Sequence, residues 1–377
     1  MKIGIVCPYN IFKGGGVQEY ALGLRNSLVK AGHKAFVITP QPIDYDGPKV
    51  PGIIMVGGAA PIRSFHTSAQ VSATVDTESL EAVLRDQNFD ILHFHEPWVP
   101  MLSRQILLRS EEAIHIATFH AAMSERRSSR TLERVITPYT KSILKYLDIM
   151  TAVSPVATNY IKSLTHRKIY IIPNAIDIDK FKKPKKLKKH NKHSKTILYI
   201  GRLEKRKAVK HLIEAFAAIN RVHPHYQLII AGDGPDKERL QEQIKEQGIT
   251  NVTFLGHIDD AEKIRLLQTS DVFCSPAMYG ESFGIVLLEA MAAGCVVVAG
   301  ANAGYETVLT GSGQISLINP KDTKDFARRL LLMASDEGLR QHWLSWAEKE
   351  VEKYSFENIV GQYIKLYELA YAKKHGE

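Results

Sequence analysis

Short apolar runs alternate with amphipathic stretches along the first half of the chain. Within the runs there is no regular alternation of polar and apolar positions, which is typical of strands buried on both faces of a parallel sheet. Between them, Gln18–Lys30 and Leu80–Asp86 carry apolar residues at helical spacing. The pattern predicts a doubly wound α/β domain. Its strands are expected at Ile3–Cys7, Ala35–Thr39, Ile53–Val56, Ile91–Phe94, Ile114–Thr118, Ile149–Val153 and Ile169–Ile172.

A second series of the same kind fills the rest of the chain. Its strands are expected at Thr196–Ile200, Gln227–Ala231, Val252–Leu255, Val272–Ser275, Val296–Ala299 and Ile315–Ile318, with helices at Val209–Ile219, Lys237–Gln247 and Ile285–Ala293. The last stretch, Glu357–Lys374, has apolar residues at helical spacing and needs a surface to cover. We therefore expect two Rossmann-like domains. The first domain comprises residues 1–173, and a C-terminal helix at 356–377 is expected to cross back to it. A basic linker at 174–195 joins it to the second domain, which comprises residues 196–355.

The charge of the chain is concentrated in one place. There are 49 Lys and Arg against 40 Asp and Glu, a net charge of +9. Nine lysines and no acid lie in Lys180–Lys195, so this one segment accounts for the whole excess. Charge confined in this way argues against a nucleic-acid-binding face. The segment is interpreted either as a solvated insertion at the domain junction or as a contact to anionic lipid.

Cysteine usage and hydropathy indicate the cellular compartment in which the protein is expected. Cys7, Cys274 and Cys295 are scattered inside apolar runs, which is typical of reduced, buried thiols. No apolar stretch reaches the ~18 residues of a membrane span. The expected location is the cytoplasm, with peripheral contact to the inner face of the cell membrane if the lysine segment binds lipid.

Two loops that follow predicted strands have residues that could bind an anion. Gly14, Gly15 and Gly16 come after the first strand and open a helix, where backbone N–H groups can approach a phosphate or sugar. This is not the dinucleotide fingerprint, which disfavours a nicotinamide-dependent oxidoreductase. Arg202 and Lys207 follow the first strand of the second half and can neutralise a phosphate. The simpler alternatives are an ordinary turn and solvated surface charges.

The stretch Tyr279–Gly294 is the most informative part of the sequence. Glu281 and Glu289 lie eight residues apart, with Gly284 between them at a predicted helix start. Free amides at 283–286 would face an anion while both carboxylates accept hydrogen bonds from hydroxyls. Donors for a diphosphate beside acceptors for a polyol favour a nucleotide-sugar site. An ordinary amphipathic helix is the alternative, but it leaves the glycine and the first glutamate unexplained.

Three histidines end predicted strands. His120 follows Ile114–Thr118, and His93 and His95 end the strand before it. The carboxyl ends of parallel strands line the ligand-binding edge of such sheets, so all three are site candidates. Alternation along the strand predicts that His93 is at least partly buried, and His120 is the favoured site residue.

The chain resembles glycosyltransferase family 4 over essentially its full length, and within it the bacterial phosphatidylinositol mannosyltransferases. The GESFGIVLLEAMAAG run at 280–294 is the most specific motif of this resemblance. The others are VCPYN at 6–10, GGVQEY at 15–20, HFHEPWVP at 93–100, ATFH at 117–120, AVSP at 152–155, IPNAIDIDKF at 172–181, GRLEKRK at 201–207, AGDGP at 231–235 and FLGHIDDAEK at 254–263. The resemblance implies the GT-B architecture, in which two Rossmann-like domains face each other across a cleft.

The resemblance also implies roles for individual residues. Arg202 and Lys207 would neutralise the diphosphate leaving group without a metal or other cofactor, and His120 would sit beside the anomeric carbon. Glu281 would accept hydrogen bonds from the sugar, and Glu289 from the ribose. The implied donor-binding set is Gly15, Gly16, Arg202, Lys207, Ile258, Asp260, Lys263, Glu281, Ser282, Phe283, Gly284, Ile285, Val286 and Glu289, with Ile258, Asp260 and Lys263 at the nucleobase. The implied acceptor-binding set is Tyr9, Gln18, Thr67 and Gln70.

The implied function is retaining transfer of a hexose from a nucleotide-sugar to a lipid-linked or inositol-type polyol. GDP-mannose is the favoured donor and phosphatidylinositol an example of the acceptor. The alternatives are a family 4 enzyme that uses UDP-glucose or UDP-N-acetylglucosamine, and a non-catalytic protein that binds a sugar nucleotide. Two departures stand out, since Ala208 replaces a frequent glycine, and the stretch Asp76–Asp86 is acidic where the mannosyltransferases have a basic membrane-docking helix.

Overall fold

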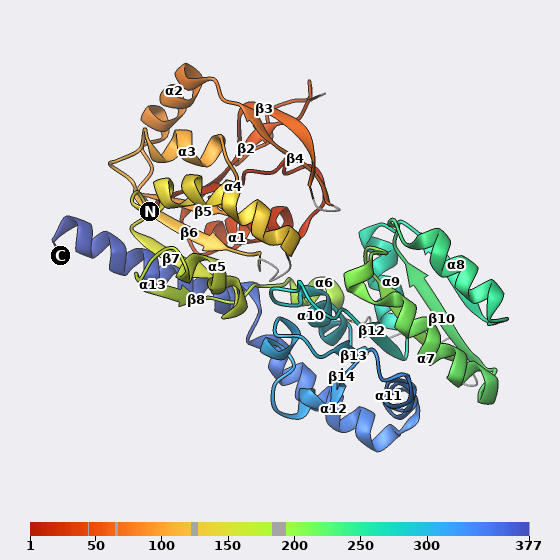
Figure 1. Ribbon diagram of the computed structural model, residues 1–377. Helices are drawn as coiled ribbons and strands as arrows, with labels where there is room; N and C mark the ends of the chain where they lie inside the picture. The colour runs from red at the N-terminus through yellow and green to blue at the C-terminus, as the bar shows by residue number, and fades with distance from the viewer. Residues whose placement is uncertain (44, 65–66, 122–126, 183–193, 377) are drawn as a thin grey trace. The chain divides into compact units, whose positions relative to one another are not determined.

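The chain folds into two compact units. The computed structural model describes residues 1–43, 45–64, 67–121, 127–182 and 194–376, with nothing described for the side chains of 62–69 and 127–135. The first unit contains Met1–Ala175 and the C-terminal segment from Phe356, and the second contains Ile176–Ser355 (Figure 1). Each unit is built on its own sheet.

The sheet of the first unit has the strand order β4-β3-β2-β1-β5-β6-β7-β8. All neighbouring pairs are parallel except β3 and β4, which are antiparallel. The strands are β1 (Lys2–Val6), β2 (Lys34–Gln41), β3 (Ile53–Ser64), β4 (Thr67–Thr74), β5 (Ile91–His95), β6 (Ile114–Phe119), β7 (Ile149–Ala152) and β8 (Ile169–Ile171). The predicted strands of this half are thereby confirmed. The antiparallel strand β4 was not predicted, because its largely polar sequence, TSAQVSAT, has no apolar run.

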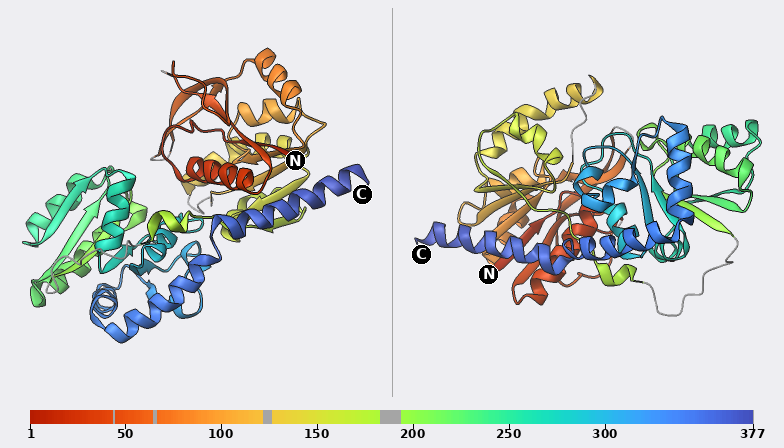
Figure 2. Two further views of the ribbon diagram at one scale, coloured as in Figure 1. Left: turned by 180° about the vertical axis from the view of Figure 1, so that it is seen from behind. Right: turned by 90° about the horizontal axis from the view of Figure 1, so that it is seen from below.

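Helices cover this sheet, and one of them comes from the far end of the chain (Figure 2). They are α1 (Gly16–Lys30), α2 (Thr77–Gln87), α3 (Leu102–Leu107), α4 (Arg127–Leu144), η1 (Val156–Thr158), α5 (Asn159–Lys162) and α13 (Phe356–His375). From α13, Ile359, Val360 and Tyr363 are buried in one core with residues of β1, β5 and α1. This burial of an apolar helix face confirms the prediction that the C-terminal helix crosses back to the first unit.

The second unit has a six-stranded, fully parallel sheet in the order β11-β10-β9-β12-β13-β14. Its strands are β9 (Lys195–Ile200), β10 (Tyr226–Ala231), β11 (Val252–Gly256), β12 (Val272–Ser275), β13 (Val296–Gly300) and β14 (Leu317–Ile318). The prediction of a strand over Ile315–Ile318 was wrong at its start, since Ile315 belongs to the 3₁₀ turn η4 (Gly311–Ser316). The other helical elements are α6 (Ile178–Phe181), η2 (Lys205–Lys207), α7 (Val209–Val222), α8 (Lys237–Glu246), α9 (Asp260–Thr269), α10 (Ile285–Ala292), η3 (Tyr305–Thr307), α11 (Thr323–Ser335) and α12 (Glu337–Glu352).

Aspartate side chains begin several of these helices by accepting hydrogen bonds from first-turn amides. Asp76 caps α2, Asp259 caps α9 and Asp177 caps α6. Both carboxylates of the Asp177-Ile-Asp179 sequence have partners in the fold, since Asp177 accepts a hydrogen bond from the amide of Lys180 and Asp179 forms an ion pair with Lys182.

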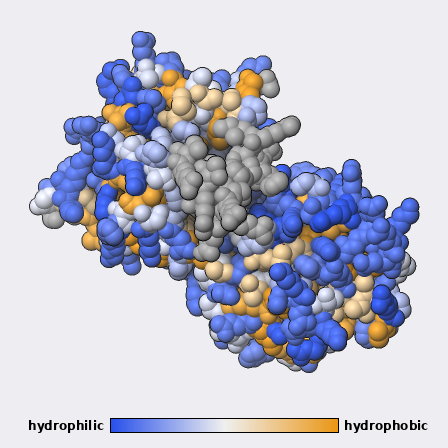
Figure 3. Space-filling model, in the orientation of Figure 1, coloured by the Kyte–Doolittle hydropathy of each residue, from blue (hydrophilic) through white to orange (hydrophobic). Residues whose placement is uncertain are grey.

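The face in Figure 3 is mostly hydrophilic, with hydrophobic residues scattered across it. Scattered apolar residues are normal on a protein surface. Among the described residues, no helix combines the length and the apolar character needed to cross a bilayer.

Candidate active site

The loop that carries Arg202 and Lys207 follows β9 and is fixed by a second loop after β10. The amide of Leu203 donates to the carbonyl of Asp233 at 2.9 Å, and the amide of Asp236 donates to the carbonyl of Leu203 at 3.0 Å. A Cβ on Gly234 would lie 2.3 Å from the carbonyl oxygen of Leu203, so a larger residue would push the loops apart. The AGDGP motif thus supports the backbone of the GRLEKRK motif.

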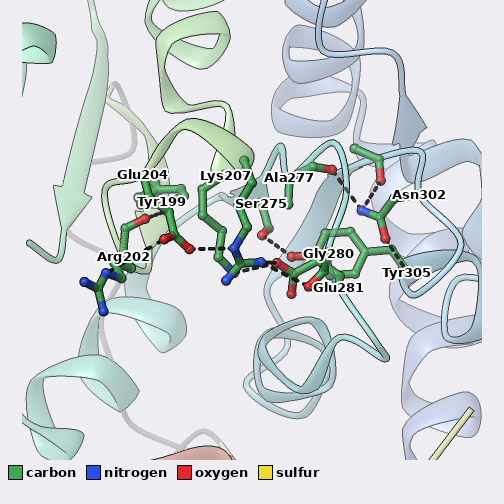
Figure 4. A network of polar contacts seen from close by, with 12 residues as sticks. Tyr199, Arg202, Glu204, Lys207, Ser275, Ala277, Gly280, Glu281, Asn302 and Tyr305 are labelled. Atoms are coloured by element: carbon green, nitrogen blue, oxygen red, sulfur yellow. Dashed lines mark hydrogen bonds and ion pairs between the residues drawn. The ribbon is translucent and has the colours of Figure 1, made fainter. Parts of the chain in front are cut away.

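Glu281 is the centre of a cluster of charges in the second unit (Figure 4). Its Oε1 accepts from Lys207 Nζ at 2.8 Å and from Arg206 Nη1. Arg206 Nε donates to Glu204 at 2.6 Å, and Arg202 Nε lies 3.9 Å from the other oxygen of Glu204. Burial disfavours the charged guanidinium, but Glu281 and Glu204 outweigh burial and raise the pKa of Arg206. Three cations against two carboxylates leave this cluster with an excess positive charge for an anionic ligand.

The loop that holds Glu281 rests on the loop after β13. The side-chain amide of Asn302 donates to the carbonyls of Ala277 at 2.8 Å and Gly300 at 3.1 Å, and Tyr305 Oη lies 2.7 Å from Ser275 Oγ (Figure 4). Gly304 lies so close that a Cβ there would be 2.2 Å from the carbonyl oxygen of Glu281. These contacts fix the backbone from which the Glu281 carboxylate projects.

Gly304→Ala is expected to destabilise the second unit by about 1–3 kcal/mol and to weaken donor binding, because the added methyl group displaces the Glu281 backbone. Gly304 has φ −70°, so alanine meets no backbone obstacle and the effect is steric. Denaturant unfolding together with nucleotide titration measures both effects. Gly338→Ala in α12 is the matched control, since the nearest atom to its new Cβ is 3.6 Å away. Equal stability and donor affinity in the two variants would contradict this account of the loop.

Helix α10 begins where the sequence predicted, after Gly284, whose φ of +123° suits glycine. The first-turn amides of Ile285 and Val286 have no partner four residues earlier within the helix, which is the usual state of a helix start. Phe283 is buried, and Ser282 lies in the loop that leads into the helix. Glu289 lies in the second turn, as expected.

A second charged group in this unit contains the residues expected at the nucleobase and the ribose. Lys263 Nζ lies 2.9 Å from Glu289 Oε1 and 3.5 Å from Asp260 Oδ1. Asp260 also pairs with Lys180 at 2.7 Å. The structure therefore brings Asp260, Lys263 and Glu289 together, and Ile258 directly precedes Asp259, the N-cap of α9.

In the first unit, His120 follows β6 and is only 7% exposed. Its Nδ1 lies 3.1 Å from Asn174 Oδ1 and its Nε2 lies 2.8 Å from His95 Nδ1, so both ring nitrogens have partners inside this unit. Burial lowers the pKa of His120 to about 4, which makes the ring neutral at pH 7. Its Nδ1 then donates to Asn174, and His95 donates to its Nε2.

His93 is a core histidine that joins β5 to its neighbours. Thr151 Oγ1 donates to the Ala117 carbonyl, so Thr118 Oγ1 must donate to Thr151. The 2.6 Å contact between His93 Nε2 and Thr118 then has the histidine as donor, and Tyr367 Oη donates to its Nδ1 at 2.7 Å. Both ring nitrogens of His93 therefore have hydrogen-bond partners, and burial lowers the pKa of His93 to about 3.

Two of the residues expected at an acceptor, Tyr9 and Gln70, lie close together in the first unit. Tyr9 bridges to Val71 in β4, and Asn10 donates from its side chain to Gln70 Oε1 at 2.6 Å. Gly16 opens α1, and the side chain of Gln18 folds back so that a Cβ on Gly15 would lie 2.5 Å from Gln18 Oε1. The Thr67 side chain lies outside the described residues.

Most of the lysine segment, residues 183–193, also lies outside the described residues. At its ends, Lys180 pairs with Asp260, Lys182 with Asp179 and Lys195 with Asp271. Contact of this segment with anionic lipid stays a prediction.

Several residues around these sites were not singled out from the sequence. Arg206 and Glu204 lie inside the GRLEKRK motif, where the two extra charges were the available signal. Asn302 and Gly304 follow the end of β13, a position at which parallel sheets carry their sites. Asn174 and Glu96 contact His120 from distant parts of the chain. Both lie inside motifs of the resemblance, IPNAIDIDKF and HFHEPWVP, which were the available signal.

Comparison with known proteins places the chain in a family. Residues 14–180 match the model of Glycosyltransferase Family 4, and residues 179–350 match that of Glycosyl transferases group 1. A phosphatidyl-myo-inositol mannosyltransferase of Mycolicibacterium smegmatis is 32% identical over 371 residues, which covers 98% of this chain and 94% of that protein. The protein of the same name from Mycobacterium leprae is 31% identical over 370 residues, which covers 98% and 96%.

Solved structures agree on the fold. Sucrose-phosphate synthase from Thermosynechococcus elongatus superposes with a TM-score of 0.78 at 20% identity, covering 99% of both chains. HepE from Anabaena, solved with UDP-glucose, superposes with a TM-score of 0.71 at 18% identity, covering 97% of this chain and 99% of its own. With its two Rossmann-like sheets of GT-B type, the chain belongs to glycosyltransferase family 4.

Proposed function

We propose that this glycosyltransferase moves a mannosyl group from GDP-mannose to an inositol-type lipid acceptor such as phosphatidylinositol, with retention at the anomeric carbon. The choice of sugar and acceptor is supported by the names of the relatives that share 31–32% of their residues with nearly the whole chain. The transfer itself is supported by the charged cluster around Glu281.

That cluster is the observation that carries the proposal. Departure of a nucleoside diphosphate builds negative charge on phosphate oxygens, and preorganised cations stabilise such charge in the transition state. Lys207 and Arg206 already converge on one carboxylate oxygen, so their side chains are positioned before any ligand arrives. The proposal assigns neutralisation of the leaving group to Arg202 and Lys207, and the sugar hydroxyls to Glu281.

Other residues take the remaining parts of the substrates. Glu289, with Asp260 and Lys263, would meet the nucleoside, and the starting amides of α10 would meet phosphate and sugar. His120 would contact the donor sugar, and Tyr9 and Gln70 the acceptor. The acceptor hydroxyl would attack on the face that the diphosphate leaves, so the product keeps the anomeric configuration of the donor.

Thermal unfolding across a panel of nucleotides tests the donor. The panel contains GDP-mannose, GDP, UDP-glucose, UDP-N-acetylglucosamine, UDP and NAD, each with and without EDTA. A ligand that binds only the native state raises the unfolding temperature by mass action. We expect stabilisation by GDP and GDP-mannose that EDTA leaves unchanged.

The other outcomes of this panel are equally informative. Stabilisation by uridine nucleotides alone would move the protein to another donor, as in HepE, which was solved with UDP-glucose. Loss of the response in EDTA would contradict leaving-group neutralisation by side chains alone. No response to any nucleotide would contradict the donor site itself.

A further inference from the structure

Glu96 follows β5 in an unusual conformation. Its φ is +49°, a left-handed region that costs a residue with a side chain about 1–2 kcal/mol. The residue is 1% exposed, although a carboxyl group is normally at the surface. Strain and burial persist in a fold only where surrounding contacts hold them in place.

The contacts of Glu96 join the ends of two neighbouring strands. Its own amide donates to the carbonyl of Thr118 in β6 at 3.0 Å. Its Oε1 accepts from the amides of His120 and Ala121, each at 2.6 Å. These two amides follow the last residue of β6, so a single carboxyl oxygen fixes the backbone where the strand has ended and His120 begins the loop.

The surroundings of Glu96 favour its neutral form. Among the described residues, no Lys or Arg lies within ion-pair distance of the carboxyl group, and Oε2 is buried without a hydrogen-bond partner. Burial raises the pKa of Glu96 to about 8, although the two amides act in the opposite direction. The titratable groups around it are Tyr9 after β1, His95 in β5 and His120 after β6, and both histidines are held neutral by burial.

We propose that Glu96 is a positioning residue for His120, whose carboxyl group holds the backbone at residues 120–121 while His95 and Asn174 hold the ring. This inference rests on the proposed function, since it takes His120 as part of the transfer site. The backbone and the ring of His120 are then held by separate contacts, which limits the movement of the imidazole relative to a bound donor sugar.

Hydrogen exchange of the amides at 120 and 121, with two variants, tests the positioning without any substrate. Glu96→Gln keeps an oxygen acceptor for both amides, whereas Glu96→Ala removes it. Both variants keep a Cβ at the same φ, so the strain is shared and their difference reports the side chain. We expect exchange at least about tenfold faster in the alanine variant and close to wild type in the glutamine variant. Equal exchange in all three proteins would overturn the proposal.

Steady-state kinetics of the same variants test whether this positioning contributes to sugar transfer. With GDP-mannose and phosphatidylinositol, we expect Glu96→Ala to lower kcat by about 10- to 100-fold with a smaller change in the KM for the donor, and Glu96→Gln to restore kcat to near wild type. A glutamine variant as inactive as the alanine variant, with its amides still protected, would overturn the proposal. A wild-type protein that transfers no sugar would instead count against the proposed function, and the exchange result would stand independently.

The pH dependence of stability supplies a third readout. A carboxyl group with its folded pKa raised to about 8 stabilises the fold fully below pH 4.5, and this contribution is lost as pH rises to about 8. Between pH 7 and 8 the denaturation midpoint of wild type should therefore fall, and that of Glu96→Gln should fall less. A parallel decline in both proteins would contradict a neutral Glu96.

Discussion

Lys207→Ala is expected to lower kcat for sugar transfer by about 10²- to 10³-fold, the usual effect of removing one preorganised donor from a transition-state site. The Lys207 side chain is only 14% exposed and its Nζ lies 2.8 Å from Glu281. Its charge is therefore little screened by water and is held in place before the leaving group develops its own. Steady-state kinetics at saturating donor measure the loss. Stability should change little, because Arg206 still pairs with Glu281 in the variant.

Lys205→Ala is the matched control for this prediction. Lys205 lies two residues away in the same 3₁₀ turn but is exposed. Its removal changes the net charge of the loop equally, and we expect kcat to stay near wild type. If Lys207→Ala and Lys205→Ala had the same turnover, Lys207 would have no special part in stabilising the leaving group.

Glu281→Ala is expected to lower kcat/KM for GDP-mannose by a comparable factor, about 10²- to 10³-fold. Under the proposed function the variant loses the acceptor for the sugar hydroxyls, and it also frees Lys207 and Arg206 from their common partner. The two effects separate by ligand, since GDP has no sugar. Calorimetric titration should show weaker binding of GDP-mannose, whereas GDP should bind at least as well as to wild type because a negative charge near the phosphates is gone.

The control for this change is Glu306→Ala, which removes an exposed carboxylate from the neighbouring turn η3. It should leave the affinities for both ligands unchanged. Weakening of GDP and GDP-mannose to the same extent in Glu281→Ala would show that Glu281 supports the site in general rather than contacting the sugar.

The fold could be predicted where single segments carry the information. The buried strands of both parallel sheets are continuous apolar runs, and α13 shows its apolar face in the spacing of Ile359, Tyr363 and Tyr367. Strand β4 has no such run, and it lies at the edge of the sheet, next to β3. Ile315 was placed in a strand because an apolar residue before Leu317 and Ile318 extends the run, whereas the chain makes a 3₁₀ turn there.

The candidate site could be predicted in part for the same reason. Gly284 and Glu289 belong to one short segment, so their places at the start and in the second turn of α10 follow from spacing. Arg206 joins the charged cluster through its ion pairs with Glu204 and Glu281, and Glu281 is 75 residues away in sequence. The partners of His120 are likewise distant, since Asn174 and Glu96 reach it only through the fold. Contacts of this kind arise from the packing of strand ends, which no local pattern records.

The departure at Ala208 also becomes clear in three dimensions. Ala208 has φ +56° and ψ 28°, the left-handed conformation that glycine adopts most easily. The turn that follows Lys207 therefore holds an alanine in a conformation that costs a residue with a side chain about 1–2 kcal/mol.

The central claim is mannosyl transfer to an inositol lipid, and the most direct measurement is the product itself. The protein is incubated with GDP-[¹⁴C]mannose and vesicles containing phosphatidylinositol, with Lys207→Ala as the blank, and the lipid fraction is examined for label and for the anomeric configuration of the sugar. We expect labelled lipid that carries an α-linked mannose and is nearly absent from the blank. Unlabelled lipid with intact GDP-mannose, or a β-linked product, would contradict the central claim.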